Sequence, residues 1–368
     1  MDANINIKNK DKNHHLNIKK KYNTSKFRYT LKIVFTIIII TLLLFSLTKR
    51  KKKQERIKFK YFACFGAVAR LENLYIRDLI SYYLSIGFSK FIFGDNNYPN
   101  VEKISDVTQD YIKKGIVDII EIYGSSINQD DFYEIIYQKY KRKCNWISFF
   151  DIDEYLRMHS QDNKIISVQQ YLSNPIFQKC ESISINWLIY SDNNLLQYDN
   201  KSVLERFTTP CYTNRENRLV KSIVRGNLNK KIFNGSSHVP VKKIIRCNSI
   251  GKRIKYYSRF YLKPPVLKYT YLMHYTTKTI EEYINKTIKR GLYGNIIYDR
   301  KERVRKFFQI NNFTKEKLRI FEKAFNMTFD QHNNYTDSDN KINLNKILII
   351  ISFSFPSIII YLKLKFRI

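Results

Sequence analysis

The sequence of 368 residues lacks several patterns that are typical of common protein classes. Its five cysteines contain no C-x-x-C pair, so a zinc site is not expected, and their odd number leaves at least one thiol without an intramolecular partner. The six histidines are scattered, which argues against a two-metal phosphodiesterase or nuclease, because a second metal ion requires further clustered ligands. Glycine and proline are scarce while Lys, Asn, Ile and Tyr are favoured throughout, and this bias weakens arguments from composition alone.

Acidic residues are outnumbered by basic ones, 32 against 65, which gives a net charge of +33. The basic residues are spread along the chain and concentrate beside a hydrophobic segment, and no nucleic-acid-binding motif accompanies them. We therefore expect no nucleic-acid partner. An anionic membrane surface or the diphosphate of a sugar nucleotide accounts for the charge equally well.

One apolar segment near the N-terminus has the length of a membrane span. The run from Ile33 to Leu47 is uncharged, and residues 29–48 reach the required length of about 20 residues if Lys32 snorkels. The long polar tail before it and the absence of a small-x-small site argue against a cleaved signal peptide. We predict a disordered tail over residues 1–28, a transmembrane signal anchor over 29–48 and a short basic stem over 49–60. Basic residues flank both ends, and the positive-inside rule leans toward a cytosolic C-terminal side.

The residues that follow alternate between strand-like and helix-like patterns, which predicts an α/β domain over 61–295. The predicted strands cover 61–69, 91–93, 116–122 and 146–150, and the clearest predicted helices cover 71–86 and 130–140. A helical extension is expected over 296–340. The apolar segment 345–363 is a second membrane contact, an interfacial helix or a buried terminal element.

Three carboxylates follow the apolar strand Trp146–Phe150, namely Asp151, Asp153 and Glu154. Side chains alternate along a strand, so Asp151 and Asp153 point to the same side where the strand ends. Carboxylates this close repel one another unless a cation joins them, and hard oxygen ligands suit Mg²⁺ or Mn²⁺ shared with a substrate phosphate. The alternative for so short a pattern is a solvated acidic turn.

Blocks on both sides of this triplet resemble glycosyltransferase family 92, the former DUF23 group, over about residues 61–291. The resembling blocks are Ala69–Glu72, Asp78–Gly87, Phe91–Asn96, Trp146–Leu156, Val203–Phe207, Lys221–Arg225, His238–Pro240 and His274–Gly291. Leu71, Leu79 and Tyr83 depart from the family pattern, which has Asn, Trp and His there.

The resemblance implies a GT-A fold, in which a nucleotide-sugar-binding mixed sheet is flanked by helices, anchored here by the N-terminal transmembrane helix. It also implies an enzyme that transfers a hexose, galactose from UDP-galactose, to a glycan acceptor with inversion. The resemblance further suggests a Golgi-facing type II membrane protein, whereas the charges that flank the anchor do not support that orientation. The alternative is a non-catalytic member of the fold that binds a sugar nucleotide or a glycan.

The same resemblance suggests a divalent metal, with Mn²⁺ preferred and Mg²⁺ as the alternative. Asp151 and Asp153 would hold it, and Glu154 is either a third ligand or a residue that orients the ligands. His274 completes the metal shell or is a histidine at a helix entry, and both can hold. Such an ion stabilises the departing diphosphate as a Lewis acid.

The remaining candidates are predicted to bind the donor or to act as the base. Uridine and ribose contacts are expected from Arg70, Glu72 and Asp95, although Asp95 is also a turn former. The phosphate oxygens are assigned to Lys221 and Arg225, each of which is alternatively a solvated charge.

Inversion needs a base that deprotonates the acceptor. Glu205 is our choice and Asp192 is its rival. For Glu205 the alternative is an ion pair with Arg206 or Lys221. His238 is expected to be structural.

Overall fold

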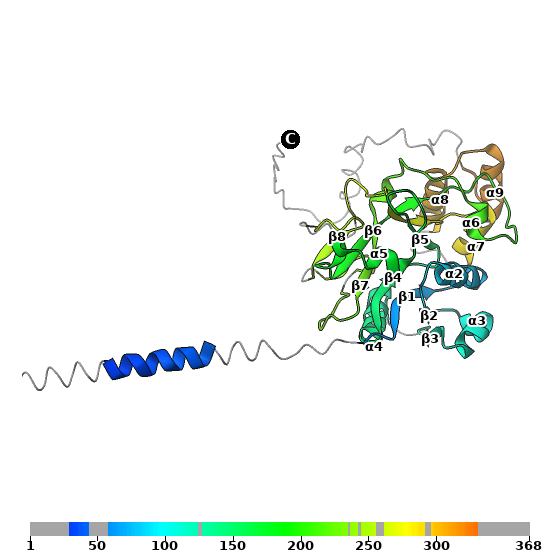
Figure 1. The fold of residues 1–368 in the computed structure, drawn as a ribbon. Coiled ribbons are helices and arrows are strands. Elements are labelled where there is room, and N and C mark those ends of the chain that lie inside the picture. The colour runs from blue at the N-terminus through cyan, green and yellow to red at the C-terminus, as the bar shows by residue number, and fades with distance from the viewer. Residues whose placement is uncertain are drawn as a thin grey trace, which may run out of the picture. The chain divides into compact units, whose positions relative to one another are not determined.

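The computed structural model describes residues 29–43, 58–123, 127–234, 236–241, 244–254, 261–290 and 296–329. The chain divides into two compact units, of which the first ends at Lys58 and the second begins at Phe59 (Figure 1). The predicted tail over 1–28 and the C-terminal apolar segment over 345–363 lie outside the described residues, as does nearly all of the predicted stem.

In the first unit, residues 29–43 form a helix whose apolar side chains are exposed. Thr36 and Thr41 each donate their hydroxyl to the carbonyl four residues earlier, so their polar groups are satisfied within the helix. No helix within the described ranges is long and apolar enough to cross a membrane. The last residues of the predicted anchor, 44–48, lie outside those ranges.

The second unit is built on a mixed sheet flanked by helices, as the sequence predicts. Among the described residues the sheet has nine strands: β1 (Tyr61–Ala69), β2 (Lys90–Asp95), β3 (Val117–Glu121), β4 (Cys144–Phe149), β5 (Glu154–Met158), β6 (Ser182–Ile189), β7 (Val220–Arg225), β8 (Arg246–Asn248) and β9 (Thr270–His274). Their order is β3-β2-β1-β4-β7-β6-β9-β5, with β8 beside β6. The strands from β3 to β4 are parallel, and β7 adds antiparallel pairing to both β4 and β6.

The helices of this unit are α2 (Asn73–Ser85), α3 (Ile104–Lys113), α4 (Gln129–Tyr140), α5 (Val168–Leu172), α6 (Val203–Arg206), α7 (Ile280–Arg290), α8 (Ile296–Phe308) and α9 (Lys315–Phe325), with 3₁₀ turns η1 (Pro175–Phe177) and η2 (Arg215–Arg218). The apolar spacing in α2 buries Ile76, Leu79, Ile80 and Tyr83 against one face of the sheet. On the opposite face α4 buries Phe132, Tyr133, Ile136 and Tyr137 (Figure 1). Both faces of the central strands are therefore covered, which explains why β1, β2 and β4 are continuous apolar runs.

The direction of the chain changes between β1 and β4. From β1 the chain passes outward through β2 to β3, and then α4 returns it to β4 on the other side of β1. In open α/β sheets a ligand binds beyond the carboxyl ends of the strands at such a switch point. Asp151 follows the carboxyl end of β4, and Arg70 follows that of β1.

Helices α7, α8 and α9 share a hydrophobic cluster of their own, which includes Tyr283, Phe307, Phe321 and Phe325. The predicted domain ends at residue 295, between α7 and α8, whereas these three helices pack together across that position. A buried ion pair joins the cluster to the rest of the unit, because Lys317 Nζ of α9 lies 2.6 Å from Asp192 Oδ2.

Four of the five cysteines form disulfides. Cys64 of β1 is bonded to Cys144 of β4, and Cys180, which precedes β6, is bonded to Cys247 of β8. Cys211 is a free thiol. Both bonds lie in the buried interior and tie neighbouring strands of the sheet.

Candidate active site

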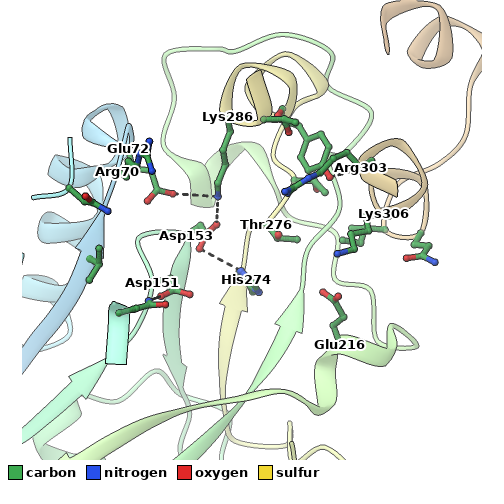
Figure 2. A pocket seen from close by; sticks show the side chains of 18 of the residues that line it. Arg70, Glu72, Asp151, Asp153, Glu216, His274, Thr276, Lys286, Arg303 and Lys306 are labelled. Carbon is green, nitrogen blue, oxygen red and sulfur yellow. Dashed lines mark hydrogen bonds and ion pairs between the residues drawn. The ribbon is translucent and has the colours of Figure 1, made fainter. Parts of the chain in front are cut away.

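A cleft of about 880 Å³ opens at the carboxyl ends of β1 and β4. Its walls come from the end of β1, the start of α4, the end of β9 and the helices α7 and α8, together with η2 (Figure 2). Four carboxylates line the cleft among the described residues: Glu72, Asp151, Asp153 and Glu216. The predicted carboxylate pair therefore lies in the cleft that the strand order places at the switch point.

Asp151 is held in the cleft by an ion pair and a hydrogen bond to its carboxylate. Lys221 Nζ of β7 lies 2.8 Å from one carboxylate oxygen, and the Gln129 amide donates to the other at 2.8 Å. Burial opposes ionisation of Asp151, but Lys221 outweighs it and lowers the pKa of this carboxyl below its usual value. Lys221 is itself only 1% exposed, so its charge is paired with Asp151 and does not reach the solvent.

Asp153 lies in the cleft between the ammonium group of Lys286 and the imidazole of His274. Lys286 Nζ of α7 lies 2.9 Å from Asp153 Oδ2, and His274 Nε2 of β9 lies 3.5 Å from Asp153 Oδ1 (Figure 2). Burial disfavours the charged form, yet Lys286 and His274 hold the pKa of Asp153 well below its usual range. The Trp187 ring packs against His274 with centroids 4.2 Å apart and fixes the orientation of the imidazole.

Glu154 does not face the cleft. It is fully buried, and its Oε2 accepts a hydrogen bond of 3.0 Å from the backbone N–H of Asp151. Burial raises the pKa of Glu154 well above its usual value, and a carboxyl must be ionised to bind a metal. Of the two predicted roles for Glu154, the geometry fits that of a residue that orients Asp151.

The side chains in the cleft fit a divalent ion that is only partly held by protein. Asp153 and His274 approach each other to 3.5 Å, a spacing that two ligands of one ion can adopt, and Asp151 lines the same cleft. Within the described ranges no three His, Cys, Asp or Glu side chains form a complete metal-binding group. Mg²⁺ and Mn²⁺ sites of enzymes that act on phosphates commonly use one or two carboxylates and take further ligands from the substrate and water.

Two of the five predicted donor-binding residues line the cleft. Arg70 and Glu72 flank Leu71, whose positive φ of 57° is unusual for a residue with a side chain, and the Leu71 N–H donates to Asn97 Oδ1. The Arg70 guanidinium stacks on the Tyr98 ring at 4.5 Å, and Glu72 pairs with Lys286 at 3.4 Å. This left-handed turn presents both side chains at the β1 end of the cleft (Figure 2).

The other three predicted donor contacts do not line the cleft. Asp95 accepts from the N–H groups of Asn97 and Ile104, which fits the turn-forming alternative. The Arg225 guanidinium donates to the carbonyls of Phe177 and Cys180. Lys221 reaches the site only through Asp151.

Neither predicted base lies on the cleft. Glu205 is exposed and caps its own helix α6, where it accepts from the Ser202 N–H and hydroxyl. It therefore pairs with neither Arg206 nor Lys221. Asp192 is buried against Lys317 on α9. The structure gives neither residue the position that deprotonation of an acceptor requires.

The sequence did not single out the far wall of the cleft. One part of that wall is formed at the start of the η2 turn by Asn214, Arg215 and Glu216. The other part comes from α8, with Arg303, Arg305 and Lys306, and from the residues just after it, Gln309 and Ile310. The η2 turn belongs to none of the resembling blocks, and α8 lies beyond them. The sequence contained only an indirect indication of this wall: Glu216 lies five residues before Lys221, which begins a resembling block.

His238 lies beneath the site and is predicted to make stability depend on pH. Its Nδ1 is 3.1 Å from the Val220 carbonyl, and burial lowers the pKa of His238 to about 4, below the ordinary 6.5. The unfolded chain therefore binds a proton more readily, so stability is complete above pH 6.5 and falls as the pH drops toward 4. Urea unfolding at pH 7 and 4.5 should show a larger loss for the wild type than for His238→Gln. Parallel losses would contradict this role.

A match to a protein family agrees with the geometry of the cleft. The family model described as glycosyltransferase family 92 matches residues 60–318. No curated protein matches the sequence. Among solved structures, the chain is similar to a crystal structure of S. aureus TarS 1-349, with 12% identity, a TM-score of 0.32 and coverage of 78% of this chain and 77% of that one. It is also similar to another crystal structure of S. aureus TarS, with 11% identity, a TM-score of 0.29 and coverage of 72% and 49%. Similarities of this size do not define a substrate. Since the family match spans well over half of the chain and includes every strand of the sheet, the protein belongs to glycosyltransferase family 92.

Proposed function

We propose that this protein is a membrane-anchored, metal-dependent glycosyltransferase that transfers a hexose, galactose from UDP-galactose, to a glycan acceptor with inversion. One observation carries the proposal: Asp151, Asp153 and His274 face a single cleft at the switch point of the sheet. A site of this chemistry suits a diphosphate, because carboxylates and an imidazole hold a divalent ion while lysine supplies further positive charge.

The residues around Asp151 and Asp153 provide contacts for both the nucleoside and the diphosphate of the donor. Arg70 and Glu72 at the end of β1 offer a charged donor and an acceptor to the nucleoside, and Asn96 lies beside them in the cleft wall. The diphosphate is expected next to Asp151, Asp153 and His274. A divalent ion bound there would supply Lewis-acid stabilisation of the charge that develops on the departing diphosphate.

The lysines prepare the site for that ion. Lys221 keeps Asp151 ionised and fixed, since their atoms lie 2.8 Å apart and the lysine is buried. Lys286 bridges Asp153 and Glu72, and its side chain is 27% exposed. It is therefore able to turn toward a phosphate oxygen and add a second positive charge.

Localisation in the secretory pathway, with the catalytic domain in the lumen, is part of the proposal. Two structural disulfides are uncommon in reducing compartments, and four of the five cysteines are paired here. The helix over 29–43 supports the membrane anchor, because a helix that exposes apolar side chains on all sides requires an apolar environment. Together they favour the type II orientation over the one that the flanking charges suggest.

A donor screen tests the proposed reaction. The purified full-length chain in detergent is incubated with Mn²⁺ and individual sugar nucleotides, and UDP release and the mass of glycan products are recorded. We expect release of UDP from UDP-galactose, abolished by a chelator and restored by Mn²⁺. A wild-type protein that binds UDP and leaves every sugar nucleotide intact would instead support the non-catalytic glycan- or nucleotide-binding alternative.

A further inference from the structure

Glu216 differs from the other carboxylates of the cleft because it is not neutralised by a cation. Glu72 and Asp153 contact Lys286, and Asp151 contacts Lys221. Glu216 is exposed, and within the described part of the chain its carboxylate forms neither a hydrogen bond nor an ion pair. Glu216 is thus the acid in the cleft that is available to accept a proton.

The backbone that carries Glu216 is firmly held. Its N–H donates to Asn214 Oδ1 at 2.8 Å, and its carbonyl accepts from the Leu219 N–H at 2.8 Å. The neighbouring Asn217 is buried, accepts from the Ile189 N–H and donates to the carbonyls of Cys211 and Tyr212. A catalytic side chain needs a support of this kind, since small displacements weaken proton transfer.

The position of Glu216 separates it from the donor side of the cleft. Figure 2 shows Arg70 and Glu72 on one side of Asp153 and His274, and Glu216 on the other, below Lys306. If the diphosphate lies against Asp151 and Asp153, the acceptor enters from the η2 and α8 side. Inversion requires the acceptor oxygen to attack from the face opposite the leaving group, which is the side of Glu216.

We propose that Glu216 is the general base of the transfer reaction, an inference that rests on the proposed function. The Glu216 carboxylate accepts the proton of the acceptor hydroxyl as that oxygen forms its bond to the anomeric carbon. The bond from this carbon to the β-phosphate oxygen breaks, and the nucleoside diphosphate departs with the electron pair. Protons and charge balance without another reactant.

Charged and polar groups of three elements lie around Glu216 in the cleft. Arg215 and Arg218 lie on its own turn, Arg303, Arg305 and Lys306 on α8, and the Tyr283 hydroxyl on α7. A general base must be ionised to accept the proton, so kcat/KM for sugar transfer is expected to fall on the acidic side of its pH profile.

The test compares the wild type with Glu216→Gln. Transfer to the sugar acceptor should fall by about 100-fold, and the acidic limb of the pH profile should disappear. Transfer to azide, an anionic nucleophile that carries no proton, should stay within about threefold of the wild type. Glu216→Asp should recover part of the sugar transfer with a shifted acidic limb.

Glu205→Gln is the matched control, because Glu205 lies off the cleft and glutamine also completes the capping box of α6. Its rates and its pH profile should match those of the wild type. Equal loss of azide and sugar transfer in a folded Glu216→Gln protein would overturn the base assignment, as would an unchanged pH profile. A wild-type protein inactive toward every sugar nucleotide would refute the proposed function instead.

Discussion

Replacing Asp153 with asparagine is expected to lower the rate of sugar transfer by roughly a thousandfold, the effect of losing several kcal/mol of charge stabilisation in the transition state. Asp153 is the central residue of the site, since both Lys286 and His274 contact its carboxylate. Asparagine keeps the shape of the side chain but removes its charge, and with it the attraction for a divalent ion. The loss should therefore appear in Mn²⁺ binding as well as in rate.

Two measurements distinguish this effect from misfolding. Mn²⁺ binding in the presence of UDP, followed by electron paramagnetic resonance, should weaken by at least tenfold, while thermal unfolding shows that the variant remains folded. Asp162→Asn serves as the control, because Asp162 is exposed in the loop after β5 and, within the described part of the chain, pairs with its neighbours Ser160 and Lys164 alone. A variant with wild-type Mn²⁺ affinity and more than a tenth of the wild-type rate would refute the assignment of Asp153.

Removing the disulfide between Cys64 and Cys144 is expected to destabilise the folded domain by about 4 kcal/mol. The bond joins β1 to β4 across a sequence separation of 80 residues, and the loop that it closes contains β2 and β3. Without it the unfolded chain gains the conformational freedom of that loop. Both cysteine side chains are fully buried, so a polar replacement would add a second cost. The double variant Cys64→Ala, Cys144→Ala avoids this because alanine is apolar.

Urea unfolding of the double variant measures the loss, and Cys211→Ala gives the control because Cys211 has no disulfide. The control should change stability by less than about 1.5 kcal/mol. Maleimide labelling of the chain extracted from cells should modify one cysteine and spare the four in disulfides. Labelling of all five would contradict both the bond and the proposed luminal location.

Local sequence patterns predicted the first half of the sheet well because the strands there are buried on both faces. The predicted strand over 61–69 coincides with β1, and the predicted helix over 130–140 differs from α4 by one residue. A short continuous apolar run that ends at a turn is typical of a buried strand. The patterns also predicted that Asp151 and Asp153 share one site, but from alternation along a strand, whereas β4 ends at Phe149 and the turn before β5 places the two carboxylates.

The second half of the cleft depends on contacts between distant segments, and no local pattern contains them. Glu205 is followed by an arginine and belongs to a resembling block, yet its carboxylate turns back to Ser202. Lys221 had the charge expected of a phosphate ligand, but the antiparallel pairing of β7 with β4 brings it under Asp151 instead. Glu216 lay in an unremarkable turn, and only the packing of α8 opposite that turn makes it part of a cleft.

The two walls of the cleft rest on different hydrophobic clusters. Arg70 and Asp151 follow strands whose side chains belong to the sheet core, whereas Arg303 and Lys306 lie on α8, which packs with α7 and α9. Lys286 of α7 contacts Asp153 and Glu72, so this first helix of the cluster also supports the opposite wall. Substitutions in α8 and α9 that leave α7 in place should thus reshape the wall that carries Arg303 and Lys306 without moving Arg70 or Asp151, which makes these two helices a natural region to exchange in chimaeric enzymes.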